Sequence, residues 1–388
     1  MRYLHLEKEE LEEKGALHTA LEIEGQPVLW QEVYNMILSK KRSIQKFLLP
    51  LLKNTELRII LTGAGSSAFV GEAAQGIVQL NTHRITHAIA TTDLVTHPYL
   101  HFVKEMPTLM VSFARSGNSP ESLEAVKLAN EYCDNVFHLV ITCSRDGLLV
   151  KNCLPNAYHL ILPERANDKS LAMTGSFTGM LLSIVLVSKI AVLETLVPAL
   201  SALINEGREL IGRYLPEIKV IAEQPFKRVI FLGSGPLLGV ARECHLKLQE
   251  LTDGQVICKH DSFLGFRHGP RAVINDDTLV VYLFSGNEHA FLYERDLSLS
   301  LDDDPRNIPT VSFNQHIKTL KNSVLEITFP EADKQENELT FIGGTVLGQL
   351  LGFFHSIYLG LHPDNPSVSG SISRVVQGVT IYRSSVAV

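Results

Sequence analysis

The sequence predicts an α/β protein with two doubly wound parallel-sheet domains in tandem. Two segments start the same pattern, in which a short apolar strand is followed by a Gly-x-Gly turn and a helix, at Gly63 and at Gly233. Most of the predicted strands are continuous apolar runs, as expected of parallel strands buried on both faces. The 388 residues exceed one ordinary core and suit two domains of moderate size.

Strands and helices alternate in the first half of the chain, after an N-terminal helical segment. Residues 7–53 combine Glu and Lys with Leu and Ile, a pattern that predicts helices. A long helix over about residues 174–203 is expected to close this half. Between these segments we expect strands at residues 58–62, 108–113, 136–142 and 158–162, and helices at 68–80 and 120–132.

The second half restarts with the same order of elements, and the break between the halves is expected near residues 207–225. We expect strands at residues 227–232, 278–284, 309–313 and 325–329, and helices at 240–251 and 339–361. These boundaries predict an N-terminal helical segment at 1–45, a first domain at 46–205 and a second domain with the C-terminal tail at 206–388.

Composition argues against several classes of protein. With 35 Lys and Arg against 42 Asp and Glu and no basic tract, the chain is a poor match for a nucleic-acid backbone. The five cysteines are widely spread without a zinc pattern, which is typical of reduced thiols in a cytoplasmic protein. The N-terminus lacks an apolar signal core, and the longest apolar stretch, residues 179–187, is short of the about 20 apolar residues of a membrane span. We therefore expect a cytoplasmic protein that does not contact membranes.

The first chemical motif is the turn that follows the strand at 58–62, where Gly63 and Gly65 precede Ser66 and Ser67. Such a turn lets backbone N–H groups and the helix dipole face an anion, and the serines add hydroxyl donors. The same letters fit a dinucleotide fingerprint, with Asp93 at a plausible distance for a ribose partner. A nicotinamide-dependent oxidoreductase and a structural tight turn therefore stay open on this motif alone.

A second polar loop, Phe113–Glu121, lies between the next strand and its helix. Ser119 or its neighbour Asn118 can cap that helix, but capping alone requires neither Arg115 nor Ser116. Hydroxyl, amide and guanidinium donors in one loop suit a phosphate. A phosphate held from two loops uses both motifs, whereas a dinucleotide fold has no use for the second.

The second half supplies a proton-transfer pair. Glu250 ends the helix after Gly235, and His268 stands in the loop Leu264–Arg271, between Arg267 and Gly269. A carboxylate and an exposed imidazole are the minimum set for moving a proton between adjacent carbons of an open-chain sugar. Residues 284–287 partly echo the second phosphate loop without its Arg-Ser pair, and we interpret them as a degenerate copy.

Taken together, these motifs resemble the sugar-isomerase (SIS) family. FARSGNSPES at 113–122, LGFRHGP at 264–270 and RVVQGVTIY at 374–382 are most similar to its AgaS group of amino-sugar phosphate deaminases and isomerases. The chain is also similar to the isomerase half of glucosamine-6-phosphate synthase. The resemblance runs from about residue 45 to the C-terminus and implies two SIS-type, flavodoxin-like domains.

The resemblance also implies roles for individual residues. The phosphate is expected at Gly65, Ser66 and Ser67 in the first loop and at Arg115, Ser116 and Ser119 in the second, where Ala114 and Arg115 depart from the family's Ser-Gln. Glu250 would act as the acid–base group. His268 would open the sugar ring and reach the site of a neighbouring subunit, in a homodimer or higher homo-oligomer. Thr174, in a strip that departs from the family at Met173 and Gly175, and Arg374 in the tail are further candidates for substrate contact.

The function implied is deamination of galactosamine 6-phosphate, or a close relative, to tagatose 6-phosphate and ammonia. Residues 1–45 are too short for a glutamine-hydrolysing domain, so the ammonia-releasing direction is expected. No metal and no organic cofactor are expected, because the carbonyl of the open sugar already acidifies the C2 proton. Two further alternatives stay open: an aldose–ketose isomerase of a neutral sugar phosphate, and a phosphosugar-sensing regulatory protein.

Overall fold

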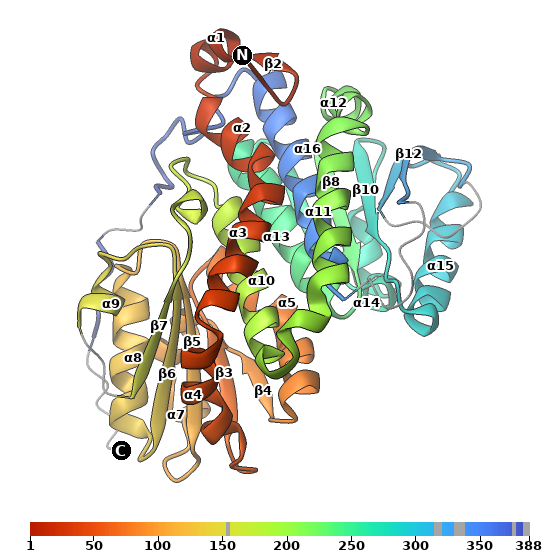
Figure 1. The fold of residues 1–388 in the computed structure, drawn as a ribbon. Coiled ribbons are helices and arrows are strands. Elements are labelled where there is room, and N and C mark those ends of the chain that lie inside the picture. The colour runs from red at the N-terminus through yellow and green to blue at the C-terminus, as the bar shows by residue number, and fades with distance from the viewer. Residues whose placement is uncertain (153–155, 314–319, 330–337, 375–377, 383–388) are drawn as a thin grey trace. The chain divides into compact units, whose positions relative to one another are not determined.

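The computed structural model of the chain contains two compact units, each with its own five-stranded sheet (Figure 1). It describes all residues except 153–155, 314–319, 330–337, 375–377 and 383–388. We name the units after the first strand of each sheet. The β3 unit consists of Leu29–Asn167, Gly175–Thr195 and Ser373–Val388, and the β8 unit of Met1–Val28, Asp168–Thr174 and Leu196–Ile372.

The sheet of the β3 unit is fully parallel, with the strand order β4-β3-β5-β6-β7. The chain leaves the centre in one direction and returns in the other, which makes the sheet doubly wound. Every residue of β3 and β5 is buried, and this explains their unbroken apolar runs. The strands are β3 (Arg58–Thr62), β4 (Thr86–Ala88), β5 (Thr108–Ala114), β6 (Val136–Thr142) and β7 (Ala157–Ile161).

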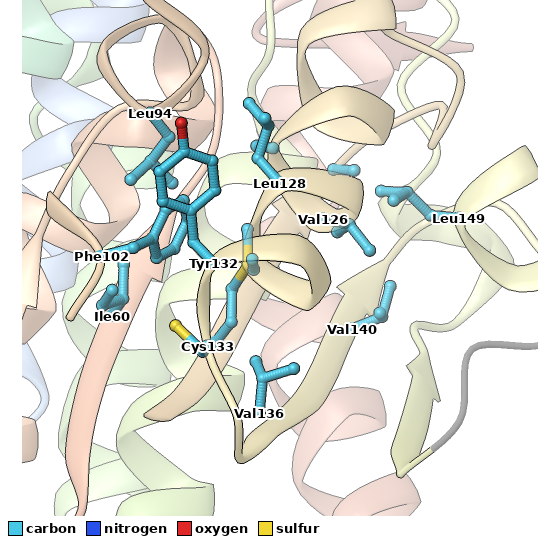
Figure 2. Close-up of a cluster of buried hydrophobic side chains, with 14 residues drawn as sticks. Ile60, Leu94, Phe102, Val126, Leu128, Tyr132, Cys133, Val136, Val140 and Leu149 are labelled. Atoms are coloured by element: carbon cyan, nitrogen blue, oxygen red, sulfur yellow. The ribbon is translucent and has the colours of Figure 1, made fainter. Parts of the chain in front are cut away.

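Helices cover both faces of this sheet. Helix α8 (Pro120–Tyr132) lies on one face, and α5 (Ser66–Thr82) and α10 (Gly175–Ser188) lie on the other (Figure 1). Figure 2 shows the cluster beneath α8, where Val126 and Tyr132 share a core with Ile60 of β3. Burying a large apolar side chain contributes about 1.5–3 kcal/mol, so this cluster fixes α8 on the strands. The other helices are α3 (Gln26–Ser39), α4 (Lys41–Leu52), α6 (Thr91–Thr96), α7 (Pro98–His101), α9 (Leu148–Lys151) and the 3-10 turn η1 (Glu164–Ala166).

The β8 unit repeats the same topology, with the parallel order β9-β8-β10-β11-β12. Its strands are β8 (Arg228–Gly233), β9 (Ile257–Asp261), β10 (Thr278–Leu283), β11 (Thr310–Phe313) and β12 (Ser323–Ile327). The prediction of two parallel-sheet α/β domains is thus confirmed.

Two central helices of the β8 unit, α13 (Pro236–Leu251) and α16 (Gly344–Tyr358), pack closely together. A Cβ added at Gly348 would lie 2.6 Å from Cys244, so the glycine permits this approach. The other elements of the unit are β1 (Arg2–Tyr3), β2 (Leu6–Glu7), α1 (Lys8–Glu13), α2 (Leu17–Glu24), α11 (Val197–Gly212), α12 (Leu215–Ala222), α14 (Phe263–Phe266), η3 (Gly269–Val273), α15 (Glu288–Asp302) and η4 (Thr340–Gly343).

The prediction of a single long helix over residues 174–203 is wrong. Helix α10 ends at Ser188, and a 3-10 segment, η2 (Ile190–Leu196), follows with a non-helical Val192 at φ −122° and ψ 29°. Pro198 lacks a backbone N–H, which a helix tolerates only in its first turn. A new helix, α11, therefore begins at Val197.

Several elements escaped the sequence analysis for physical reasons. Strand β4 has only three residues, and β9 is an edge strand of mixed polarity, so neither forms an apolar run. Helices α11 and α12 occupy most of residues 207–225, where the break between domains was expected. The domain boundaries at 45/46 and 205/206 stay a prediction.

Among the residues that the structure describes, two helical stretches are long and apolar enough to match a membrane span by length and composition alone. Thr340–Tyr358 is 94% buried in its apolar window, and Ile190–Gly212 is half buried and interrupted at Val192. The apolar surface of Thr340–Tyr358 is covered by the protein itself, as in a core helix.

Candidate active site

The first predicted phosphate loop lies at the carboxyl end of β3. Gly65 has φ +57° and ψ −131°, a conformation that favours glycine, and a Cβ at Gly63 would lie 2.6 Å from the Ser67 backbone. The turn therefore needs both glycines. Ser66 and Ser67 begin α5 and are 4% and 5% exposed. Their hydroxyl groups lie in the turn at the helix N-terminus, where partial positive charge favours an anion.

The second predicted loop follows β5, the strand that pairs with β3 in parallel. Ser116 Oγ accepts a hydrogen bond from the backbone N–H of Asn118 at 3.3 Å, and Asn118 Oδ1 accepts one from Leu148 N at 2.9 Å. Ser119 is the N-cap residue of α8, and its Oγ bonds Ser122 Oγ at 2.6 Å. These bonds hold the loop in shape. Both loops thus stand at the carboxyl ends of neighbouring strands, the usual ligand edge of an open α/β sheet.

The structure gives Arg115 a contact that the sequence did not predict. Its side chain is 7% exposed and donates a hydrogen bond to the backbone carbonyl of Arg374. Arg374 in turn donates to Asn167 Oδ1 at 3.2 Å. A guanidinium carries five donors, so holding the tail does not exhaust its capacity for a phosphate. The structure therefore brings Arg374 to the second loop through its backbone; residues 375–377 of the same motif lie outside the described residues.

Glu250 stands near the end of α13 in a charged group of three. Lys247 Nζ lies 2.5 Å from Glu250 Oε2 and 3.4 Å from Glu243 Oε1. Lys247 and Glu243 are 1% and 0% exposed, whereas the Glu250 side chain is 23% exposed. A buried ammonium thus holds one oxygen of a carboxylate that a ligand can still reach. The sequence analysis missed Lys247 and Glu243, although their i,i+3 and i,i+4 spacing along the helix was the available signal.

His268 lies in the loop between α14 and η3 and is exposed. The loop is fixed on its amino side, because Ser262 Oγ caps α14 by accepting a hydrogen bond from Gly265 N at 3.0 Å. The backbone N–H of His268 bonds the carbonyl of Gly265 at 3.2 Å. An imidazole on a fixed loop is suited to meet a partner or substrate.

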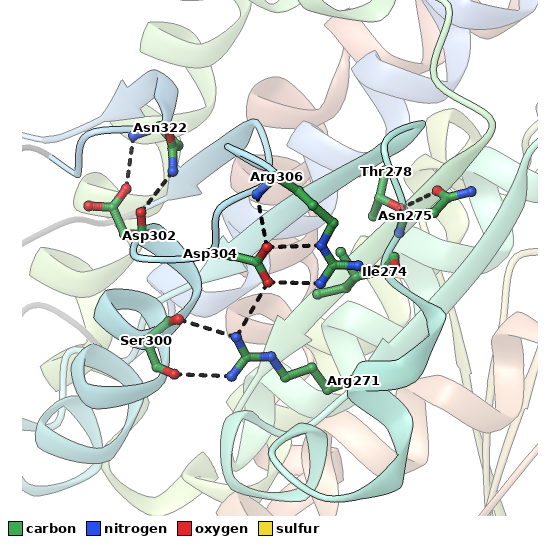
Figure 3. Close-up of polar contacts among 9 residues, drawn as sticks. All are labelled: Arg271, Ile274, Asn275, Thr278, Ser300, Asp302, Asp304, Arg306 and Asn322. Carbon is green, nitrogen blue, oxygen red and sulfur yellow. Dashed lines mark hydrogen bonds and ion pairs between the residues drawn. The ribbon is translucent and has the colours of Figure 1, made fainter.

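A second polar network fixes the carboxyl side of the same loop (Figure 3). Arg271 donates to Ser300 Oγ at 3.0 Å and to the Ser300 carbonyl at 3.2 Å, which joins η3 to α15. Asp304 accepts two hydrogen bonds from the Arg306 guanidinium, at 2.9 and 2.8 Å, and these bonds lower the pKa of its carboxyl group. Arg306 also donates to the carbonyl of Ile274 at 2.6 Å. The segment after His268 is therefore tied down at both ends.

Thr174, the other candidate for substrate contact, is fully buried. Its backbone N–H and its hydroxyl donate to Asp168, at 2.8 and 3.2 Å. Nearby, Glu22 accepts from the backbone N–H of Lys169 at 2.5 Å. Burial and the charge of Asp168 raise the pKa of Glu22 to about 7. Contact of Thr174 with a substrate stays a prediction.

The candidate residues fall into two groups. Both phosphate loops and Arg374 belong to the β3 unit, while Glu250, His268 and Thr174 belong to the β8 unit. Within the described residues, no hydrogen bond or ion pair joins the Glu250 and His268 side chains. Their roles in binding and proton transfer stay predictions.

Comparison with known proteins decides the family. The model of the SIS domain matches residues 51–189. A D-galactosamine-6-phosphate deaminase AgaS from Shewanella sp. (strain ANA-3) is 38% identical over 384 residues, which cover 98% of this chain and 95% of the relative. The chain belongs to the AgaS family of SIS-domain proteins. The resemblance drawn from the sequence motifs is thus confirmed.

Solved structures of similar proteins agree with this AgaS assignment. A tagatose-6-phosphate ketose/aldose isomerase from Escherichia coli is 33% identical, with a TM-score of 0.86 over 95% of this chain and 97% of that one. A candidate enzyme of the same name from Clostridium novyi is 36% identical, with a TM-score of 0.93 over 99% of this chain and 100% of that one. The C-terminal domain of glucosamine-fructose-6-phosphate aminotransferase from Francisella tularensis shares the fold, at a TM-score of 0.70 and 19% identity over 88% and 96%.

Proposed function

We propose that the protein deaminates galactosamine 6-phosphate, or a close relative, to tagatose 6-phosphate and ammonia. The observation that carries the proposal is near full-length similarity to D-galactosamine-6-phosphate deaminases, at 38% identity over 98% of the chain. Two polar glycine-containing loops on adjacent strands and a partly exposed carboxylate beside a buried lysine support it. These are the parts that an amino-sugar phosphate requires.

The phosphate is assigned to Ser66, Ser67, Arg115, Ser116 and Ser119, with the Gly65 turn beneath it. Hydroxyl and guanidinium donors at a helix N-terminus complement a dianion, and Arg contributes a permanent charge. This anchor would leave the reacting carbons, C1 and C2, free to meet the acid–base groups. Binding of the phosphate from two loops also fixes the substrate's orientation, which lowers the entropic part of the barrier.

Proton transfer is assigned to Glu250. In the open-chain aminoaldose the C1 aldehyde acidifies the C2 proton, which the carboxylate removes to give an enolamine. Return of a proton to C1 gives the 2-imine, and water then hydrolyses the imine to the ketose and ammonia. The Lys247 ammonium, 2.5 Å from Glu250 Oε2, orients the carboxylate.

His268 is assigned to ring opening, in the active site of a neighbouring subunit of a homodimer or higher homo-oligomer. His268→Ala should then slow only substrates that arrive as closed rings. Mixing Glu250→Gln and His268→Ala proteins under subunit exchange should restore activity at sites that receive both wild-type residues. If exchange is demonstrated and activity stays at the mutant level, His268 serves its own chain or is not catalytic.

A second candidate is an aldose–ketose isomerase of a neutral sugar phosphate, because the similar solved structures carry the name tagatose-6-phosphate ketose/aldose isomerase. That reaction uses the same proton transfer and releases no ammonia. A soluble, cytoplasmic enzyme without a bound metal or organic cofactor is expected in either case.

The deciding experiment supplies galactosamine 6-phosphate, N-acetylgalactosamine 6-phosphate and tagatose 6-phosphate separately to purified protein. We expect ammonia from the first and none from the others, with Glu250→Gln as the inactive control. Activity should persist after exhaustive chelation. Interconversion of tagatose 6-phosphate with an aldose, without release of ammonia from the amino sugar, would favour the second candidate.

A further inference from the structure

The β8 unit repeats the backbone of the first phosphate loop and one hydrogen bond of the second. Gly235, which follows β8, has φ +58° and ψ −128°, against +57° and −131° at Gly65. A Cβ at Gly233 would lie 2.3 Å from the Leu237 carbonyl oxygen, so this turn also needs glycine. After β10, Ser285 Oγ accepts from Asn287 N at 3.1 Å, as Ser116 Oγ does from Asn118 N in the β3 unit. The first turn is therefore formed twice, whereas the second turn shares this hydrogen bond but not the φ of +69° that Gly117 has in the β3 unit.

The side chains on these turns differ. The helix after Gly235 begins with Pro236 and Leu237, where the β3 unit has Ser66 and Ser67. The residue before Ser285 is Phe284, whereas Arg115 precedes Ser116, and Phe284 is 0% exposed and belongs to an apolar cluster. The β8 unit has thus lost two hydroxyl donors and the cation.

A carboxyl group stands in their place. Glu294 on α15 is 0% exposed, and its Oε2 accepts a hydrogen bond from the backbone N–H of Ser285 at 2.8 Å. The side chain of Ser234, in the turn after β8, is its second hydrogen-bonding neighbour. Glu294 Oε2 is thus bonded from the turn after β10, while Glu294 Oε1 is buried without a hydrogen-bond partner and faces this polar site. In the β3 unit the residue nine positions after Ser116 is Ala125, a member of the apolar cluster beneath α8.

We propose that the Glu294 carboxyl group is the permanent occupant of an oxyanion cradle formed by Ser234 and Ser285, and that removing it opens a latent phosphate site in the β8 unit. Glu294 Oε2 accepts the bond from the Ser285 backbone N–H, so the donor that an anion would use in this turn is already occupied. The chain accordingly binds one phosphosugar through its β3 unit, although its fold contains two cradles. This inference does not rest on the proposed reaction, because all of its residues lie in the β8 unit.

The test uses inorganic phosphate as the probe and calorimetric stoichiometry as the readout. Wild-type protein should bind one phosphate per chain. Glu294→Ala and Glu294→Ser should bind a second, whereas Glu294→Gln should not, because its amide fills the space. The second site should be at least roughly tenfold tighter in the Ala or Ser variant than in the Gln variant, a difference expected from one good hydrogen bond. A stoichiometry of one in every folded variant would overturn the proposal.

A measurement on the wild-type protein keeps the proposal falsifiable if the small variants do not fold. Amide hydrogen exchange should show phosphate-dependent protection at residues 63–67 and 115–119 and none at 233–237 and 284–288. Protection of the second pair of segments in wild-type protein would show that Glu294 does not exclude anions. Absence of protection at the first pair would count against the phosphate site of the β3 unit and leave the Glu294 variants to decide the present inference.

Discussion

In the β3 unit the helix after the first strand begins with Ser66 and Ser67, whereas in the β8 unit the equivalent helix begins with Pro236 and Leu237. The two turns have the same backbone conformation, and the two sheets have the same strand order. The glycines therefore determine the shape of each turn, and the residues beside them determine what it binds. A Gly-x-Gly turn therefore predicts the local fold, but it does not by itself predict a ligand.

A second difference concerns charge. The β3 unit places the cation Arg115 beside its loops, and the β8 unit places carboxylates on its helices: Glu294 on α15 and the Glu243–Lys247–Glu250 group on α13. Cationic and hydroxyl donors suit binding of a phosphate, while a carboxylate that stays partly exposed suits proton transfer. The two units thus carry complementary halves of the proposed chemistry.

The largest expected effect separates catalysis from binding. Glu250→Gln should lower kcat for galactosamine 6-phosphate by about 10²–10⁴-fold, because the amide cannot accept a proton. KM should change little, since the phosphate loops lie in the other unit. Gln249→Ala, an exposed neighbour on the same helix, is the matched control and should keep full activity. A large rise in KM with kcat unchanged would place Glu250 in binding instead.

Arg115→Ala tests the phosphate-binding half of the proposed chemistry. A hydrogen bond to a charged group contributes roughly 1.5–3 kcal/mol, so KM should rise about ten- to a hundredfold. Since Arg115 also holds the carbonyl of Arg374, the C-terminal tail should become more accessible to proteases. The control is Arg165→Ala, which replaces a half-exposed arginine of the same unit. It should change neither KM nor the protease sensitivity of the tail. Equal losses with phosphorylated and unphosphorylated amino sugar would make Arg115 purely structural.

The two glycine turns allow a direct comparison of shape and function. Gly65→Ala and Gly235→Ala each force a side chain into a strained backbone conformation, and each should lower the free energy of unfolding by about 1–3 kcal/mol in urea. Only Gly65→Ala should also raise KM. If Gly235→Ala raised KM as much, the β8 turn would take part in substrate binding.

The smallest effect is a difference in acid sensitivity. Burial and neighbouring His159 lower the pKa of His138 in the β3 unit to about 4. Because the unfolded chain has the higher pKa, it binds the proton first, and stability should fall as the pH drops from about 6.5 towards 4. His138→Gln should flatten this fall in Tm, while exposed His87→Gln should not. An unchanged slope in His138→Gln would assign the acid sensitivity elsewhere, for example to His245 and His260 of the β8 unit, whose pKa values burial also lowers to about 4.

Sequence patterns predicted much of the fold because the central strands are buried on both faces. Helix α8 and strand β6 have the predicted bounds, 120–132 and 136–142. Prediction failed where tertiary context decides: at edge strand β9, and at the break after Ser188. Local residue patterns indicate an apolar run or a glycine turn, but they do not show which side of an edge strand is covered.

In the candidate site, too, local sequence patterns predicted some features and missed those that depend on tertiary contacts. The serines of the first loop and the position of His268 follow from local motifs. The bond between Arg115 and Arg374 joins residues 259 positions apart, and no local pattern predicts it. Glu294 escaped notice because a lone helical glutamate ordinarily faces solvent, and only the packing of α15 turns it towards Ser285. Long-range contacts of this kind need the structure.

One measurement tests the central claim, that the phosphate loops and Glu250 together serve deamination. Galactosamine 6-phosphate is incubated with the protein in D₂O, and the reaction is followed by NMR. We predict tagatose 6-phosphate with deuterium at C1 and one equivalent of ammonium, and neither product with Glu250→Gln. A substrate that stays unchanged, or a ketose formed without ammonium, would contradict the account.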